Sequence, residues 1–166
     1  MFARSFAGRG RGSAVLGLSV RYGTGISITL EKSEAFVRHI SPPELDAPPG
    51  YSQIVEVRPR RLIFIAGQTA VDQNGGLVGR NDFAAQAARV FQNLGIALQA
   101  ADCSAGDLVK LTVYLRNMDD LAAYREARDR FFAAVTPPAA PAITLVEVSR
   151  LYGTDFLIEI EAIAAA

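Results

Sequence analysis

Two acidic side chains near the end of the chain are the first candidates for chemistry. Glu159 and Glu161 stand two positions apart in the run Phe156 to Ala164, whose residue types predict a strand. Because side chains alternate along a strand, both carboxylates are expected on one face of a sheet. Such a carboxylate can transfer protons, but two acids on one face also form solvated or salt-bridged stripes. The spacing alone leaves both interpretations open.

Other reactive side chains are sparse. A single cysteine, Cys103, excludes an intrachain disulfide, and a single histidine, His39, leaves no Cys/His cluster with zinc spacing. Cys103 is expected to be a loop thiol between a helix and a strand. Ser52, His39 and Asp155 supply the residue types of a hydrolase triad, but no Gly-x-Ser-x-Gly turn is present. We therefore predict no triad, no metal and no cofactor.

Size and charge limit the classes of function. The chain has 166 residues, 50% of them hydrophobic, which suits one domain with a buried core. Seventeen basic residues balance seventeen acidic ones, so a strongly basic nucleic-acid footprint is excluded. No segment approaches the ~20 apolar residues of a membrane helix. The expected partners are small molecules or copies of the same chain, with no nucleic acid and no membrane.

Residues 1–40 are interpreted as a leader in front of a domain at 41–166. The leader is rich in Gly and Ser, and four arginines precede its first acidic residue, Glu31: Arg4, Arg9, Arg11 and Arg21. This composition resembles a mitochondrial transit peptide. A disordered extension, or upstream sequence translated from an early start codon, explains it equally well. A cytoplasmic location is therefore expected, with a mitochondrial one as the alternative.

The first half of the domain contains two strands. Pro-rich residues 41–50 mark its entrance, since proline breaks helices. Ser52 to Val57 and Arg61 to Ala66 are rich in Val, Ile and Phe, and only Arg58-Pro59-Arg60 separates them. This spacing predicts that the two strands form a hairpin. Residues 72–76 are a turn-forming loop without a phosphate-binding motif.

Helical periodicity begins at Asp82, which can cap a helix of about 19 residues. Its apolar members recur at three- and four-residue steps: Phe83, Ala87, Val90, Phe91, Leu94, Ala97 and Leu98. A strand over 107–115 follows, and Asp119 and Asp120 open a second helix that runs to about Ala134. The expected buried members of this helix are Leu121, Tyr124, Phe131, Phe132 and Val135.

Two last strands, 142–148 and 156–164, complete the order β-β-α-β-α-β-β. That order and length predict an α+β fold with one sheet and both helices packed on a single face.

Four segments carry a resemblance to a known family: Gly50-Tyr51-Ser52-Gln53, Ile63-Phe64-Ile65-Ala66-Gly67-Gln68, residues 107–115, and Ile158-Glu159-Ile160-Glu161-Ala162-Ile163-Ala164. In this order they resemble segments of the Rid family (reactive intermediate deaminases, also called YjgF-like). The resemblance implies a chorismate-mutase-like fold with a mixed sheet, a homotrimer, and ligand clefts between subunits. It also implies cofactor-free hydrolysis of 2-imino or enamino acids to 2-keto acids and ammonia, a reaction that needs an oriented water and managed protons.

The resemblance also suggests site residues. Tyr51 matches a pocket tyrosine, Glu159 a glutamate that handles the attacking water, and Gly67 and Gln68 the strand end beside the cleft. Tyr51 and Glu159 each have a simpler interpretation. Tyr51 can be an aromatic plug at the domain entrance with its hydroxyl in water, and Glu159 can be part of a solvated or salt-bridged acidic stripe.

One position departs from the family pattern. Where the archetypal deaminases have an arginine in a Pro-Ala-Arg context to anchor the substrate carboxylate, this chain has Pro141-Ala142-Ile143. Ile143 has no donor for a bidentate clamp, which places the protein in a divergent subgroup. Arg125 is a candidate replacement cation from another wall of the cleft, although helix arginines are more often solvated or intersubunit charges.

Two hypotheses follow. The first is a deaminase-like hydrolase that uses Glu159 and Tyr51. The second is a non-catalytic trimeric module that binds a small metabolite or a partner protein in the same cleft, and Ile143 favours it.

Overall fold

The computed structural model describes residues 18–21, 27–30 and 35–166, and the chain divides into two compact units, 1–34 and 35–166. In the first unit β1 (Leu18–Arg21) pairs antiparallel with β2 (Ser27–Leu30). The transit-like or disordered leader expected at residues 1–40 falls largely on residues outside the described ranges. The second unit begins at Ala35 and so includes the last residues of the expected leader together with residues 41–166.

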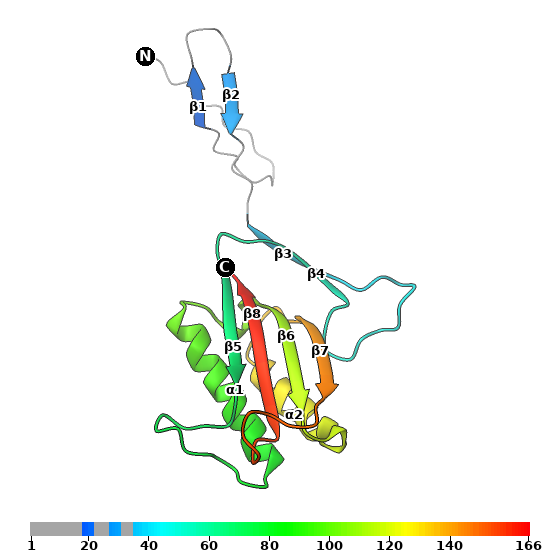
Figure 1. Ribbon diagram of the computed structural model, residues 1–166. Coiled ribbons are helices and arrows are strands. Elements are labelled where there is room, and N and C mark those ends of the chain that lie inside the picture. Colours follow the sequence, from blue (N-terminus) through cyan, green and yellow to red (C-terminus); the bar gives the residue numbers. More distant parts are fainter. Residues whose placement is uncertain (1–17, 22–26, 31–34) are drawn as a thin grey trace. The chain divides into compact units, whose positions relative to one another are not determined.

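A four-stranded mixed sheet forms the centre of the second unit. Its strands are β5 (Leu62–Gln68), β6 (Leu108–Leu115), β7 (Ala142–Glu147) and β8 (Ile158–Ala165), in the spatial order β5-β8-β6-β7 (Figure 1). β8 runs antiparallel to both of its neighbours, whereas β6 and β7 are parallel. The strand that is last in sequence is therefore an inner strand of the sheet.

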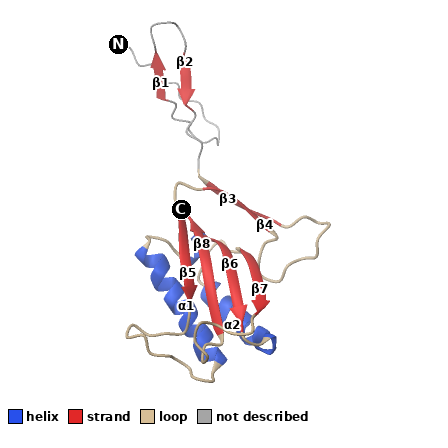
Figure 2. Cartoon of the chain, viewed as in Figure 1, coloured by secondary structure: helices blue, strands red, loops and turns tan. Residues whose placement is uncertain are grey.

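Two α-helices cover one face of this sheet. α1 (Phe83–Ala100) contacts β5, β8 and α2 (Leu121–Phe132), and both helices lie behind the strands in Figure 2. The short 3-10 helices η1 (Ala105–Asp107) and η2 (Met118–Asp120) precede β6 and α2. The predicted α+β fold, with one mixed sheet and two helices on one face, is confirmed.

The α1 prediction is confirmed in detail. Asp82 has an extended backbone, and its Oδ1 accepts a hydrogen bond from the Ala85 N–H at 3.0 Å. The predicted apolar face is buried except for Ala97, which is half-buried. α2 ends at Phe132, two residues earlier than expected, and Asp119 and Asp120 lie in η2 instead of the α-helix.

The predicted hairpin is wrong. β4 (Ile54–Arg58) pairs antiparallel with β3 (Phe36–Ile40), a strand that the sequence analysis did not expect, while β5 pairs with β8. The backbone N–H groups of Arg60 and Arg61 both donate to the carbonyl of Ala166, at 2.9 and 2.7 Å. The end of β8 thus hydrogen-bonds the start of β5. These residues are about a hundred positions apart, so local sequence patterns do not reveal the pairing.

No helix in the described part of the chain is long and apolar enough to cross a membrane.

A buried amide fixes the loop that leads into β8. Gln86 is fully buried on α1; its Nε2 donates to the carbonyls of Gly79 (3.1 Å) and Asp155 (2.8 Å), and its Oε1 accepts from the Leu157 N–H (2.8 Å). Three backbone groups from two loops therefore depend on one side chain. The last of them lies two residues before Glu159, so this network helps to set where that carboxylate stands.

We expect Gln86→Leu to lower the free energy of unfolding by about 2–4 kcal/mol, because it leaves three part-buried backbone groups without partners. Urea denaturation measures this change. Gln99→Leu, at an exposed position of the same helix, is the control and should stay within about 0.5 kcal/mol of wild type. Equal effects of the two substitutions would contradict a structural role for the Gln86 network.

Candidate functional site

Glu159 lies on the face of the sheet that the helices do not cover. Along β8, Ile158, Ile160, Ala162 and Ala164 are buried against the helices, whereas Glu159 is half-buried and Glu161 is exposed. The predicted common face of the two carboxylates is confirmed. Across the ladder, Glu159 stands opposite Tyr114 of β6.

Gly67 is required by the position of this carboxylate. The register of β5 against β8 shifts between Ile65 and Gln68, and a methyl group at Gly67 would overlap Oε1 of Glu159. The glycine therefore leaves space for the carboxylate to lie against the backbone of the neighbouring strand. The sequence-predicted residues Gly67 and Glu159 come together here.

Two causes raise the pKa of Glu159 above the ordinary value of a glutamate. Partial burial is the larger, and the charge of Glu161 on the same strand face is the smaller. A carboxyl group whose pKa is raised toward neutrality is better able to give and take a proton during a reaction. Burial and Glu161 also raise the pKa of Tyr114.

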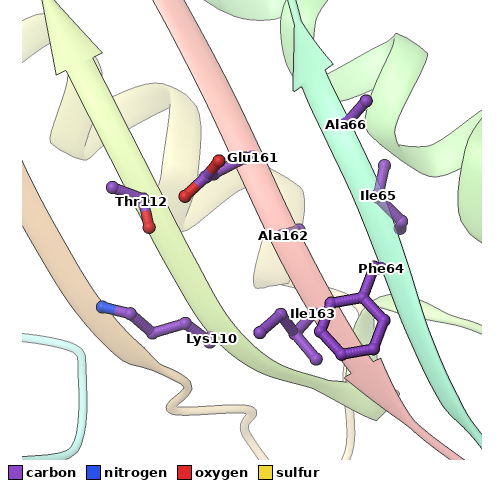
Figure 3. A pocket seen from close by; sticks show the side chains of 8 residues that line it. All are labelled: Phe64, Ile65, Ala66, Lys110, Thr112, Glu161, Ala162 and Ile163. Atoms are coloured by element: carbon purple, nitrogen blue, oxygen red, sulfur yellow. The ribbon is translucent and has the colours of Figure 1, made fainter.

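The same face carries a cavity of about 360 Å³ (Figure 3). Its polar members are Lys110, Thr112 and Glu161, and Phe64 and Ile163 form much of its apolar wall. Lys110 hydrogen-bonds the hydroxyl of Thr144, and burial lowers its pKa. Phe64 is 75% exposed, so this face presents a large apolar side chain to water beside its polar residues.

Tyr51, Ile143 and Arg125 lie together, but on the other side of the sheet. Ile143 pairs with Leu111, whose side chain is fully buried under the helices, so both point to the helix face. A cavity of about 270 Å³ opens there; its lining residues are Pro49, Tyr51, Leu121, Tyr124, Arg125, Arg128, Ile143 and Leu145. The predicted site residues thus form two groups on opposite faces.

Gln68 belongs to neither group. Its amide Nε2 donates to the carbonyl of Ala66 at 3.0 Å, and its side chain lines a further cavity beside α1, together with Arg89 and Asn93. Gly67 and Gln68 are adjacent in sequence and were predicted to lie beside one cleft. The register of β5 against β8 shifts at these residues, and only Gly67 lies against Glu159.

Arg128 is the residue that the sequence analysis missed. It is 6% exposed and lines the cavity of Tyr51 and Ile143, whereas Arg125 is exposed. A signal exists in the sequence: Leu121, Tyr124, Arg128 and Phe131 follow each other at steps of three, four and three, so an arginine occupies a position on the apolar face of α2.

The residue types of a triad do not form one. Ser52 Oγ lies 3.3 Å from His39 Nδ1, but the same nitrogen lies 2.9 Å from the carbonyl of Ala140, to which it must donate its hydrogen. It cannot then accept the serine proton. Asp155 instead pairs with Arg80 at 2.5 Å. Cys103 is buried, with its Sγ directed to the carbonyl of Ala101 at 3.5 Å.

Among the described residues, no group of three or more His, Cys, Asp or Glu side chains is arranged to hold a metal ion.

Comparisons with known proteins agree on one family. The family model described as Endoribonuclease L-PSP matches residues 42–166. A RutC family protein of Pyrococcus abyssi is 40% identical over 114 residues, which cover 69% of this chain and 84% of the relative. A 2-iminobutanoate/2-iminopropanoate deaminase of Salmonella typhimurium is 37% identical over 103 residues, 62% of this chain and 78% of the relative.

A solved structure gives the same answer for the fold. The Rid family protein YyfB of Yersinia pestis, of unknown function, superposes with a TM-score of 0.70 at 35% identity, covering 78% of this chain and 98% of that one. This likeness confirms the expected chorismate-mutase-like fold.

Replacing Glu161 by glutamine should lower the pKa of Glu159, because it removes the nearby negative charge, but not to the ordinary value, because burial remains the larger cause. A carboxyl-carbon NMR titration measures the pKa of Glu159 in the wild-type protein and in Glu161→Gln. Glu126→Gln, on the exposed side of α2, is the control and should change nothing. An unchanged pKa of Glu159 in Glu161→Gln would show that the two carboxylates do not interact.

Proposed function

This chain belongs to the Rid family of YjgF-like proteins, and from that membership we propose that it is a cofactor-free hydrolytic deaminase of a small imine or enamine. The observation that carries the proposal is the Glu159 carboxyl group, which is half-buried against Gly67 and has a raised pKa. The relative named as an imine deaminase supports the choice of reaction.

The reaction needs little beyond proton transfer. Water adds to the carbon of the C=N bond and the nitrogen takes up a proton, which gives a carbinolamine. The C–N bond then breaks, ammonia leaves, and the hydroxyl loses its proton to form the C=O bond. One carboxyl group can serve both steps, first by removing a proton from the attacking water and then by returning one to the leaving nitrogen. In this proposal Glu159 has that role, and Tyr51 helps to hold the substrate.

A homotrimer with clefts between its subunits is part of the proposal. Glu159 and Tyr51 lie on opposite faces of one sheet, so a single copy does not supply both to one cavity. The uncovered face exposes Phe64 (75%) and Leu62 (49%), and apolar surface of this kind favours contact with another protein. A second copy that packs there would bring a new set of side chains to Glu159.

The proposed partners are a small-molecule substrate and copies of the chain, in the cytoplasm. The balanced charge, seventeen basic against seventeen acidic residues, argues against a nucleic-acid partner.

A second candidate function is a non-catalytic module that binds a small metabolite or a partner protein in the same cleft. Ile143 favours it, since an aliphatic side chain cannot clamp the carboxylate of a 2-imino acid. The two candidates differ in whether the bound molecule is hydrolysed. A deaminase releases ammonia in a way that depends on Glu159, whereas a binding module is only stabilised by its ligand.

We expect the protein to accelerate ammonia release from freshly generated 2-iminobutanoate, and Glu159→Ala to reduce that acceleration by about 10²- to 10⁴-fold through loss of acid–base catalysis. Ammonia and 2-oxobutanoate are measured over time, with a reaction without protein as the baseline. The control Glu126→Ala removes an exposed carboxylate of α2 and should act as wild type. Equal rates with and without protein would contradict the proposed deaminase activity and favour the binding module.

Light scattering on the full chain should give about three times the monomer mass of 17.8 kDa. Phe64→Glu places a charge on the uncovered sheet face and should give monomers, because burying an unpaired carboxylate in a contact is unfavourable. Ile96→Glu changes an exposed apolar residue of α1, away from that face, and should leave the mass unchanged. A wild-type monomer would rule out a cleft between subunits.

A further inference from the structure

Tyr152, in the loop between β7 and β8, is exposed to water and yet held in place by its neighbours. The residue is 75% exposed. Its hydroxyl lies 2.9 Å from Oγ1 of Thr69, and its ring packs on Phe156 with the ring centroids 4.7 Å apart and the ring planes at 48°. A tyrosine held in this way has already lost its rotamer freedom, so contact with a ligand costs little further entropy.

The loop that carries Tyr152 is fixed as well. Gly153 lies so close to Phe156 that a methyl group there would stand 2.7 Å from Cε2 of that ring. The carbonyl of Asp155 accepts a hydrogen bond at 2.8 Å from Nε2 of Gln86, which is fully buried. The position of the exposed ring is therefore set before any ligand arrives.

Thr69 stands beside Glu159, at the end of the sheet where β5 ends and β8 begins (Figure 1). Gln68 pairs with Ile160, so continuing the same register by one residue places Thr69 opposite Glu159. Gln68 lines the cavity beside α1, and Ala70 belongs to the core. Because side chains alternate along an extended chain, Thr69 is directed to the other face, the one that carries Glu159.

The hydrogen bond to Thr69 therefore brings the phenol of Tyr152 to the side of the Glu159 carboxylate. Residues directly opposite each other in an antiparallel pair have Cβ atoms about 5 Å apart. A molecule that reacts at Glu159 and extends past Thr69 meets the exposed ring of Tyr152. The ring is thus a candidate wall of the site.

The chemistry of this wall favours a flat group. Aromatic rings attract each other in offset-stacked and edge-to-face arrangements, which strengthens binding by about 3- to 10-fold beyond the effect of buried area. A saturated ring with the same number of carbon atoms buries at least as much apolar surface but lacks this attraction. The two kinds of ring therefore distinguish an aromatic wall from a merely apolar one.

We propose that Tyr152 is a specificity-determining residue that selects imines or enamines with a flat, aromatic or conjugated side chain. This assignment rests on the proposed function and names the substrate class of the same site. The carbon of the C=N bond lies at Glu159, and the flat group lies against the exposed face of the Tyr152 ring. Thr69 and Phe156 are positioning residues, because they hold the ring and do not touch the substrate.

The first experiment measures binding, without turnover. Isothermal titration calorimetry with the full chain compares phenylpyruvate with 3-cyclohexyl-2-oxopropanoate, which differs only in having a saturated ring. Burial of apolar area alone favours the cyclohexyl compound. We expect phenylpyruvate to bind about 3- to 10-fold more tightly. Equal affinities, tighter binding of the cyclohexyl compound, or no binding of either overturns the proposal.

Substitutions then assign the preference to the ring. Tyr152→Leu keeps an apolar side chain but removes the flat ring, so the cyclohexyl compound should bind at least as tightly as phenylpyruvate. Tyr152→Phe keeps the ring and should preserve the preference to within about twofold, since the aromatic pair is unchanged. Leu45→Ala changes an apolar residue that is 52% exposed, in the segment before β4, and is the control; it should behave as wild type.

A preference that survives in Tyr152→Leu, or that is lost equally in Tyr152→Phe, overturns the proposal. Light scattering tests the other use of an exposed aromatic ring, which is contact between copies of the chain. If Tyr152→Leu lowers the mass and leaves the preference unchanged, the ring belongs to that contact and the proposal is wrong.

Turnover separates this proposal from the proposed function. Tyr152→Leu should raise KM for the imine of phenylpyruvate with little change in kcat, and it should leave 2-iminobutanoate unaffected, which a general structural defect would not do. A preference that depends on Tyr152 without any ammonia release keeps the specificity residue and removes the deaminase. Ammonia release from both imines that falls equally in Tyr152→Leu keeps the deaminase and removes the specificity residue.

Discussion

The pairing of β8 with both β5 and β6 is the constraint on which the rest of the domain depends. β8 is last in sequence and lies inside the sheet, so the sheet is incomplete until the end of the chain has been added to it. Its buried residues, among them Ile158 and Ile160, complete the core under the helices. Because side chains alternate between the two faces along a strand, Glu159 and Glu161 then lie on the opposite face.

The two faces of the sheet create two chemical environments. On the uncovered face, Glu159 sits against the backbone of Gly67 and close to Glu161, and burial together with the neighbouring charge raises its pKa. On the helix face, Tyr51, Arg125 and Ile143 line a separate cavity. One face thus favours proton transfer, and the other carries the remaining predicted site residues apart from Gln68. A ligand that uses both requires a second copy of the chain, which is why assembly is central to the proposed function.

Arg128 lies near Ile143 in space although the two residues are on different elements. Considered alone, an aliphatic residue at the position where the family resemblance expects an anchoring arginine argues against an acidic substrate. In the structure, Ile143 of β7 and the buried Arg128 of α2 line the same cavity, so a positive charge is present beside β7 although no residue of β7 supplies it.

The sequence by itself determined the elements whose signal is local. Apolar periodicity and the Asp82 cap placed α1 nearly to the residue, and strand alternation put Glu159 and Glu161 on one face. Only the tertiary structure decided the pairing of β4 with β3 and of β5 with β8, because hydrogen bonding between distant strands leaves no local pattern. The spacing of Leu121, Tyr124 and Arg128 already places Arg128 on the apolar face of α2. Only the tertiary structure decided that the turn at Gly50 packs against its guanidinium, because residues so far apart in sequence leave no local pattern.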